Sequence, residues 1–245
     1  MVDDTFAIAE WGQKSVAVNQ FINTHIETKK LRMHTPDETG KTKCHKIHVG
    51  CKNLVCPELE VHGTLMKEVK KDTYLGDVVR SDGKNTSSLK NRVSRGIGSC
   101  SRIMNVLETV SFGKSYFKIA ISLREAMFLS TVMTNMEVWY GVSKAEVEEL
   151  EMFDRILLRN ILWLPRSTPT EILYLETGCL NIGTILKMRR INYLQYLLKS
   201  DEEKMLSQFF KTQLSFPVKD DWTEQVKMDL EDFQIGNNLD WIKSK

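Results

Sequence analysis

An α+β fold is predicted by a change of pattern near Asn85. Upstream, short runs with β-branched residues stand between turn residues, as in Thr73–Val79 before Ser81-Asp82-Gly83. Downstream, apolar residues recur at helical spacing over long segments. With 245 residues, 42% of them hydrophobic, the chain can bury a sizeable core. We therefore predict a small antiparallel sheet in residues 1–83, followed by helices in residues 84–165 and 166–245.

The first part combines one helix with several short strands. The helix is predicted from Ser15, whose side chain suits an N-cap, to about Lys30, because the apolar residues between them approximate helical spacing. Turn residues follow in Thr35–Gly40. The segments predicted as strands are Thr5–Ala9, Cys44–Cys51, Leu59–Val61 and Thr73–Val79.

The rest of the chain is predicted to be helical. The segments with helical periodicity are Ser87–Leu107, Lys114–Gly141, Ala145–Leu164, Pro169–Thr177, Ile182–Lys199, Glu202–Leu214 and Trp222–Phe233. Gly or Pro breaks separate most of them. In Ala145–Leu164, one apolar face is formed by Leu150, Phe153, Leu157, Ile161 and Leu164. The tryptophans interpreted as packing residues are Trp139, Trp163, Trp222 and Trp241.

The composition favours an intracellular protein that does not span a membrane. The five cysteines are an odd number, and no apolar run opens the chain, so we expect free thiols in the nucleus or cytoplasm. The most apolar stretch, Ile119–Val142, contains Arg124, Glu125 and Glu137, and a membrane span would bury these charges in lipid. Formal net charge is only +2, yet basic residues cluster locally. Oligomeric state is not predicted.

An adjacent pair of carboxylates, Asp3 and Asp4, precedes the first predicted strand. Phosphoryl transfer by two Mg²⁺ ions about 4 Å apart requires clustered carboxylate oxygens, which such a pair supplies. The alternative is a charged, solvated N-terminus without a catalytic role. The motifs that follow along the chain decide between these interpretations.

Four groups of motifs follow one another in an informative order. Val2-Asp3-Asp4 resembles a polymerase catalytic box, and Lys41-Thr42-Lys43-Cys44 resembles the Lys-containing segment that closes a palm domain. Tyr74-Leu75-Gly76, followed by Ser81-Asp82-Gly83, resembles the hairpin that grips a primer strand. The helical motifs further on are Arg155–Leu164, Thr168-Pro169-Thr170, Leu173–Gly178 and Met188-Arg189-Arg190. From Asp3 to about Lys199 the sequence is thus similar to the downstream half of a non-LTR (LINE-like) retrotransposon reverse transcriptase.

This resemblance implies an RNA-directed DNA polymerase with an RNA template and a DNA primer. It implies a palm remnant in 1–83, thumb-like helices in 84–165 and a C-terminal helical region in 166–245. By the same resemblance Asp3 and Asp4 hold Mg²⁺, and Lys41 and Lys43 lie near the incoming triphosphate. The residues implied to bind primer or template are Tyr74, Leu75, Gly76, Arg92, Arg95 and Arg102. The fingers and the strand with the other catalytic Asp have no counterpart, so a truncated polymerase, inactive by itself, is expected.

A second hypothesis is a non-catalytic helical module for interaction or nucleic-acid binding, derived from a decayed element. Its basis is the intact apolar periodicity after Asn85. Separately, the helix predicted near Ser87–Leu107 places Arg92, Arg95 and Arg102 on a similar side, able to meet phosphates. A solvated basic face without a ligand is the alternative interpretation of these arginines.

A zinc site is a further possibility, because two Cys and two His lie within eight residues. The candidate ligands are Cys44, His45, His48, Cys51, Cys56 and His62. If Cys44–Cys51 is a strand, however, Cys44 and His48 lie roughly 13 Å apart and Cys51 points to the other side. A strand with satisfied polar residues is therefore the favoured interpretation, and a loop conformation would revive the metal site.

Overall fold

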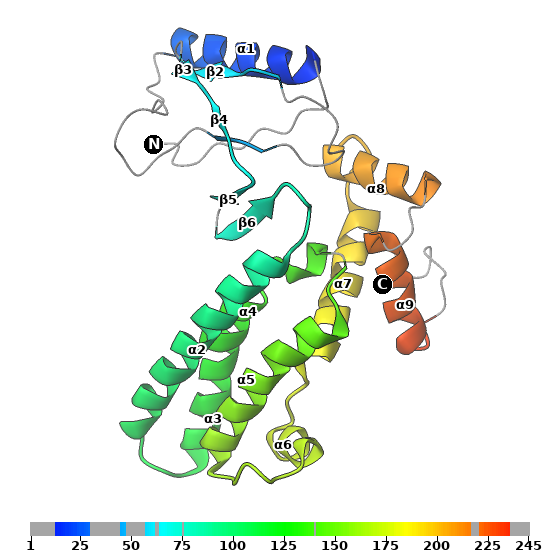
Figure 1. The fold of residues 1–245 in the computed structure, drawn as a ribbon. Helices are drawn as coiled ribbons and strands as arrows, with labels where there is room; N and C mark the ends of the chain where they lie inside the picture. Colours follow the sequence, from blue (N-terminus) through cyan, green and yellow to red (C-terminus); the bar gives the residue numbers. More distant parts are fainter. Residues whose placement is uncertain are drawn as a thin grey trace. The chain divides into compact units, whose positions relative to one another are not determined.

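The computed structural model describes residues 13–29, 45–47, 57–61, 64–74, 76–139, 141–216 and 221–235 (Figure 1). The chain divides into two compact units, 1–88 and 89–245. Helices predominate and the strands are short, so the fold is α+β. The structure divides the chain once, at Ser88, whereas the sequence predicts boundaries after residues 83 and 165.

The first unit holds helix α1 and the strands. Their bounds are α1 Gln13–Thr28, β1 His45–Lys46, β2 Glu60–Val61, β3 Thr64–Leu65, β4 Lys67–Glu68, β5 Lys71–Tyr74 and β6 Asp77–Arg80. The helix predicted from Ser15 is present, but Ser15 lies inside α1 and is not its N-cap. The side-chain amides of Asn19 and Asn23 each donate to the carbonyl of Glu60 at 2.8 Å, which ties α1 to β2.

The strands pair two by two rather than in one sheet. Within the described residues, β2 pairs with β3 and β5 with β6 in antiparallel fashion, while β1 and β4 are parallel. The predicted antiparallel sheet is therefore wrong for β1, which is the described part of the strand predicted at Cys44–Cys51. The run predicted at Thr73–Val79 forms a hairpin, because Gly76 turns the chain with φ 90°.

The second unit is helical. Its elements are α2 Thr86–Glu108, whose start belongs to the first unit, α3 Lys114–Leu123, the π-helix η1 Arg124–Leu129, α4 Ser130–Val132, the 3₁₀ helix η2 Met136–Val138, α5 Lys144–Leu162, α6 Thr170–Thr177, α7 Ile182–Lys199, α8 Met205–Ser215 and α9 Trp222–Asp232. These helices confirm the predicted segments closely. The exception is Lys114–Gly141, where the helix ends at Val132.

Local chemistry explains several helix ends. Ser143 and Glu146 form a capping box at the start of α5, and Asn181 and Asp221 cap α7 and α9 through side-chain oxygens. Gly178 follows α6 in the left-handed conformation, with φ 64°. These signals are local in sequence, which is why the predicted bounds are accurate there.

Two apolar clusters form the core of the second unit. The larger one joins α2 to α5 and includes Ile182 and Leu186 of α7, so helices on both sides of Pro165 share one core. The smaller one joins α7, α8 and α9 around Leu194, Phe210 and Trp222. Among the described residues, no helix is both long and apolar enough to cross a bilayer.

Candidate nucleic-acid interface

The exposed side of α2 is rich in cations and carries no carboxylate before Glu108, its last residue. No Asp or Glu occurs between Asp82 and Glu108. From Lys90 to Asn105, the exposed residues are Lys90, Asn91, Ser94, Arg95, Ile97, Ser101, Arg102 and Asn105. None of the ion pairs among the described residues includes Arg95 or Arg102. This side of α2 therefore presents positive charge that no acid of the same helix neutralises until Glu108.

The middle of this side is flanked by small polar residues. Asn91, Ser94, Gly98, Ser101 and Asn105 follow at alternating steps of three and four, which places them in one row along the helix. A Cβ at Gly98 would meet only the Arg102 guanidinium, at 3.9 Å. A partner backbone can therefore approach α2 closely while Arg95 and Arg102 reach it from the edge of the row.

The prediction that Arg92 shares this exposed side is wrong. Arg92 is 5% exposed and belongs to the buried series with Leu89, Val93 and Gly96. Its guanidinium carbon lies 4.4 Å from the centroid of the Trp139 ring, and its Nη1 donates to the carbonyl of Val132 at 3.4 Å. Both contacts turn it away from any partner of α2.

The physical reason is the end of α4 at Val132. The last carbonyls of a helix have no intrahelical donor, and a buried carbonyl requires one. Arg92 supplies a donor to Val132, and Arg189 of α7 supplies one to Met133 at 3.0 Å. Cations at a helix C-terminus also interact favourably with its dipole. Arg92 is thus a structural residue.

The β5–β6 hairpin of the first unit is held at its base. The Ser88 hydroxyl accepts from the Val78 N–H at 2.7 Å and donates to the Val78 carbonyl at 3.2 Å. Arg80 donates to both carboxylate oxygens of Asp82, at 2.9 and 2.6 Å, and to Ser87 Oγ at 2.8 Å. These hydrogen bonds lower the pKa of Asp82 below its usual value. The hairpin is therefore fixed to the first turn of α2, with Tyr74 at the end of β5 and Gly76 in the turn that follows.

Most other predicted site residues lie outside the described part of the chain. These are Asp3, Asp4, Lys41, Lys43, Cys44, His48, Cys51, Cys56, His62 and Leu75. Trp241, interpreted as a packing residue, also lies outside the described residues. Within the described residues, no group of three or more His, Cys, Asp or Glu side chains could hold a metal ion. His45, one of the candidate zinc ligands, pairs through Nδ1 with Asp72 at 2.6 Å. The Mg²⁺ and zinc hypotheses therefore stay predictions.

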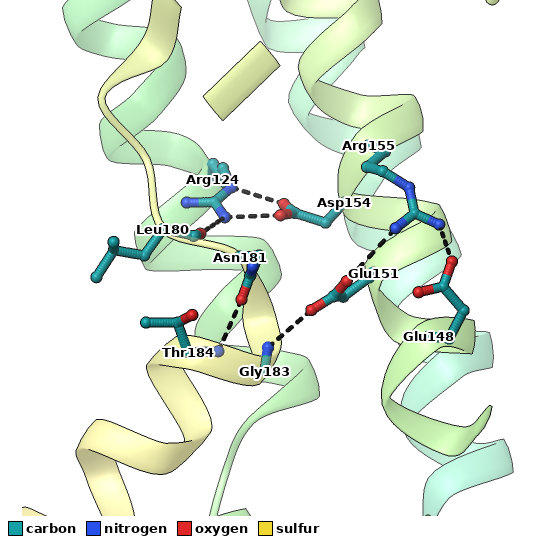
Figure 2. Close-up of polar contacts among 9 residues, drawn as sticks. All are labelled: Arg124, Glu148, Glu151, Asp154, Arg155, Leu180, Asn181, Gly183 and Thr184. Carbon is teal, nitrogen blue, oxygen red and sulfur yellow. Dashed lines mark hydrogen bonds and ion pairs between the residues drawn. The ribbon is translucent and has the colours of Figure 1, made fainter. Parts of the chain in front are cut away.

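A buried ion pair that the sequence analysis did not identify as a pair organises the middle of the second unit (Figure 2). Arg124, the first residue of η1, donates to both carboxylate oxygens of Asp154 at 2.6 and 2.7 Å and to the Leu180 carbonyl at 3.1 Å. Burial disfavours the charged guanidinium, but the hydrogen bonds and charge of Asp154 outweigh it and raise the pKa of Arg124. The signal in the sequence that could have indicated a buried pair was Arg124 itself, a charged residue inside the apolar stretch Ile119–Val142.

Neighbouring contacts fix the start of α7 in the same way (Figure 2). Glu151 accepts from the Gly183 N–H at 2.9 Å, and Asn181 accepts from the Thr184 N–H at 2.7 Å. Arg155 pairs with Glu148 and Glu151. Since each of these groups is engaged within the protein, the cluster positions helices and has no free acid or base for catalysis.

A hollow of about 180 Å³ lies between α7, α8 and η2. Its lining is largely apolar and aromatic, with Tyr193, Phe210 and Trp222 among the contributors, and Tyr193 is its single ionisable residue. Burial raises the pKa of Tyr193, so the hydroxyl stays protonated at neutral pH. The hollow offers no acid–base chemistry.

Comparisons with protein families, curated proteins and solved structures returned no match for this chain.

Proposed function

We propose that this chain binds the sugar–phosphate backbone of nucleic acid through α2 and does not polymerise nucleotides by itself. The observation that carries the proposal is the exposed side of α2. There Arg95 and Arg102 lie beside a row of small polar residues, and the helix has no carboxylate before Glu108. Phosphate contacts of this kind position a protein on nucleic acid and carry no sequence information.

The proposed origin is the downstream part of a non-LTR retrotransposon reverse transcriptase. It is supported by the order of a Tyr74-Leu75-Gly76 hairpin, a basic helix and further helices along the chain. In a complete enzyme, the partners would be an RNA template and a DNA primer, and Asp3 and Asp4 would hold Mg²⁺. In keeping with the resemblance, this chain by itself is proposed to have no polymerase activity and to act in the nucleus or cytoplasm.

Nucleic-acid titrations at several salt concentrations test the proposal. An RNA–DNA hybrid is titrated with the wild type and with the variant Arg95→Ala/Arg102→Ala, with fluorescence anisotropy as the readout. Each lost phosphate contact lowers the slope of log affinity against log salt by about 1, so the double variant should lower it by about 2. The same protein should give no primer extension with Mg²⁺ and deoxynucleotides.

The control is Lys118→Ala/Lys227→Ala, which removes the same net charge from exposed positions on α3 and α9. It should leave the slope close to that of the wild type. If both double variants weaken binding equally, net charge alone drives association and the α2 interface is wrong. Measurable primer extension would contradict the absence of polymerase activity.

A further inference from the structure

The outer side of α5 carries large apolar residues that stay exposed in the described chain. Met152 and Ile156 are each 44% exposed, and Trp163, the C-cap, is 73% exposed. They belong to a row at alternating steps of four and three, hereafter the α5 crest: Ala145, Glu149, Met152, Ile156, Arg159 and Trp163. This spacing is that of a seam between two packed helices.

Trp163 is held outward in a fixed position. It has φ 57°, in the left-handed region that bulky residues rarely adopt. The Leu164 N–H donates to the Arg159 carbonyl at 2.9 Å, and Arg159 Nη2 donates to the Thr168 carbonyl at 2.9 Å, which ties the following loop to α5. Because the side chain is left exposed, the fold does not offset this unfavourable conformation by burying it. A partner that buries the Trp163 side chain would offset this unfavourable conformation.

The α5 crest is complementary to itself in the antiparallel direction. Its members are placed symmetrically about Asp154, so a two-fold axis at that level pairs each with another member. Met152 then meets Ile156 of a second copy, Glu149 meets Arg159 of the second copy, and Trp163 meets Ala145 of the second copy. Apolar meets apolar, acid meets base, and the largest side chain meets the smallest.

We propose that the α5 crest is the interface through which two copies of this chain associate, with their α5 helices antiparallel. A parallel arrangement would oppose Glu149 to Glu149, whereas the antiparallel one also places Glu148 opposite Asn160 of the second copy, whose amide can donate to it. One helix from each copy gives a contact at the small end of specific interfaces, below roughly 1,200 Å² in total. The dissociation constant should therefore be on the order of micromolar.

Sedimentation velocity of the full chain tests the proposal, from about 1 µM to about 100 µM. The wild type should pass from monomer to dimer in this range. Ile156→Glu places a charge in the centre of the seam and should raise the dissociation constant at least about tenfold. Leu175→Glu is the matched control, since Leu175 is 81% exposed on α6, outside the α5 crest, and should leave the dimer unchanged.

Charge reversal distinguishes this register from other contacts. Glu149→Arg opposes two arginines in the homodimer, and Arg159→Glu opposes two glutamates, so each variant alone should be weakened. A mixture of the two variants forms a heterodimer in which both pairs are complementary, and it should recover dimerisation. Circular dichroism checks that Arg159→Glu, which also loses its bond to Thr168, keeps its helices.

Three results would overturn the proposal. The first is a wild type that stays monomeric at about 100 µM, which would leave the α5 crest to a different protein. The second is a dimer that Ile156→Glu leaves intact, which would place the contact elsewhere on the chain. The third is a mixture of the charge-reversal variants that dimerises no better than each one alone.

Discussion

Helices α2 and α5 pack into the same apolar core but expose opposite kinds of surface. The outer side of α2 is cationic and polar, whereas that of α5 is apolar with an acidic and a basic half. Their inner sides differ too, because α2 buries the cation Arg92 and α5 buries the anion Asp154. The apolar periodicity that places one side of a helix in the core therefore says little about what binds its exposed side. That depends on the residues at the exposed positions.

The largest expected effect is on the free energy of unfolding, which should fall more when the charge of Asp154 is removed than when that of Arg92 is. Asp154→Ala leaves Arg124 buried without its counter-charge, which costs about 3–5 kcal/mol. Arg92→Met loses a cation–π contact and a long hydrogen bond but keeps much of the packing, so about 1–2 kcal/mol is expected. Urea unfolding followed by circular dichroism measures both.

The control for the buried pair is Arg124→Met/Asp154→Leu, which removes both charges together. Replacing a buried ion pair by apolar side chains is often neutral, so this variant should recover most of the stability lost in Asp154→Ala. A double variant as unstable as the single one would show that the pair contributes through geometry that apolar packing does not replace.

Two glycines on α2 lie on different sides of the helix, Gly96 on the side facing the core and Gly98 on the outer side. A Cβ at Gly96 would lie 2.7 Å from Val132 Cγ1 and 3.3 Å from Phe128 Cε2, both in fully buried side chains. Gly96→Ala should destabilise the protein by about 1–3 kcal/mol through overpacking. A Cβ at Gly98 would make only an ordinary contact, with the Arg102 guanidinium at 3.9 Å, so Gly98→Ala should stabilise the protein by up to about 1 kcal/mol, since alanine favours the helix. Equal thermal shifts for the two variants would contradict this assignment of sides.

Sequence periodicity was sufficient where local signals end a helix. Asn181 caps α7, and the predicted segment Ile182–Lys199 is confirmed at both ends. The predicted apolar face of α5 is also confirmed, with Leu150, Leu157 and Ile161 buried.

Tertiary contacts decided the cases that sequence could not. The predicted helix Lys114–Gly141 stops at Val132 although apolar residues continue, because Arg92 and Arg189 satisfy the freed carbonyls. Trp139 and Trp222 are packing residues as predicted, whereas Trp163 is exposed because it ends α5 in the left-handed conformation. Such partners lie about 40 and 56 residues away and leave no local pattern.

The smallest expected effect concerns Cys100 of α2, which packs against the larger apolar cluster. Burial, and then the negative charge of Asp154, raise the pKa of this thiol from 9.0 to about 11. The folded state therefore retains the thiol proton when the unfolded chain has lost it. This contribution to stability is complete below about pH 9 and disappears as the pH rises through about 11.

Urea unfolding at about pH 8 and about pH 10 measures this dependence. Burial also raises the pKa of Tyr174, so the wild type should lose stability over this interval through both groups. Cys100→Ala should lose less over the same interval, whatever its stability at the lower pH, because a pH-dependent difference cannot come from the small cavity that alanine leaves. An identical loss in the wild type and in Cys100→Ala would mean that the thiol is more hydrated than its packing against the larger apolar cluster indicates.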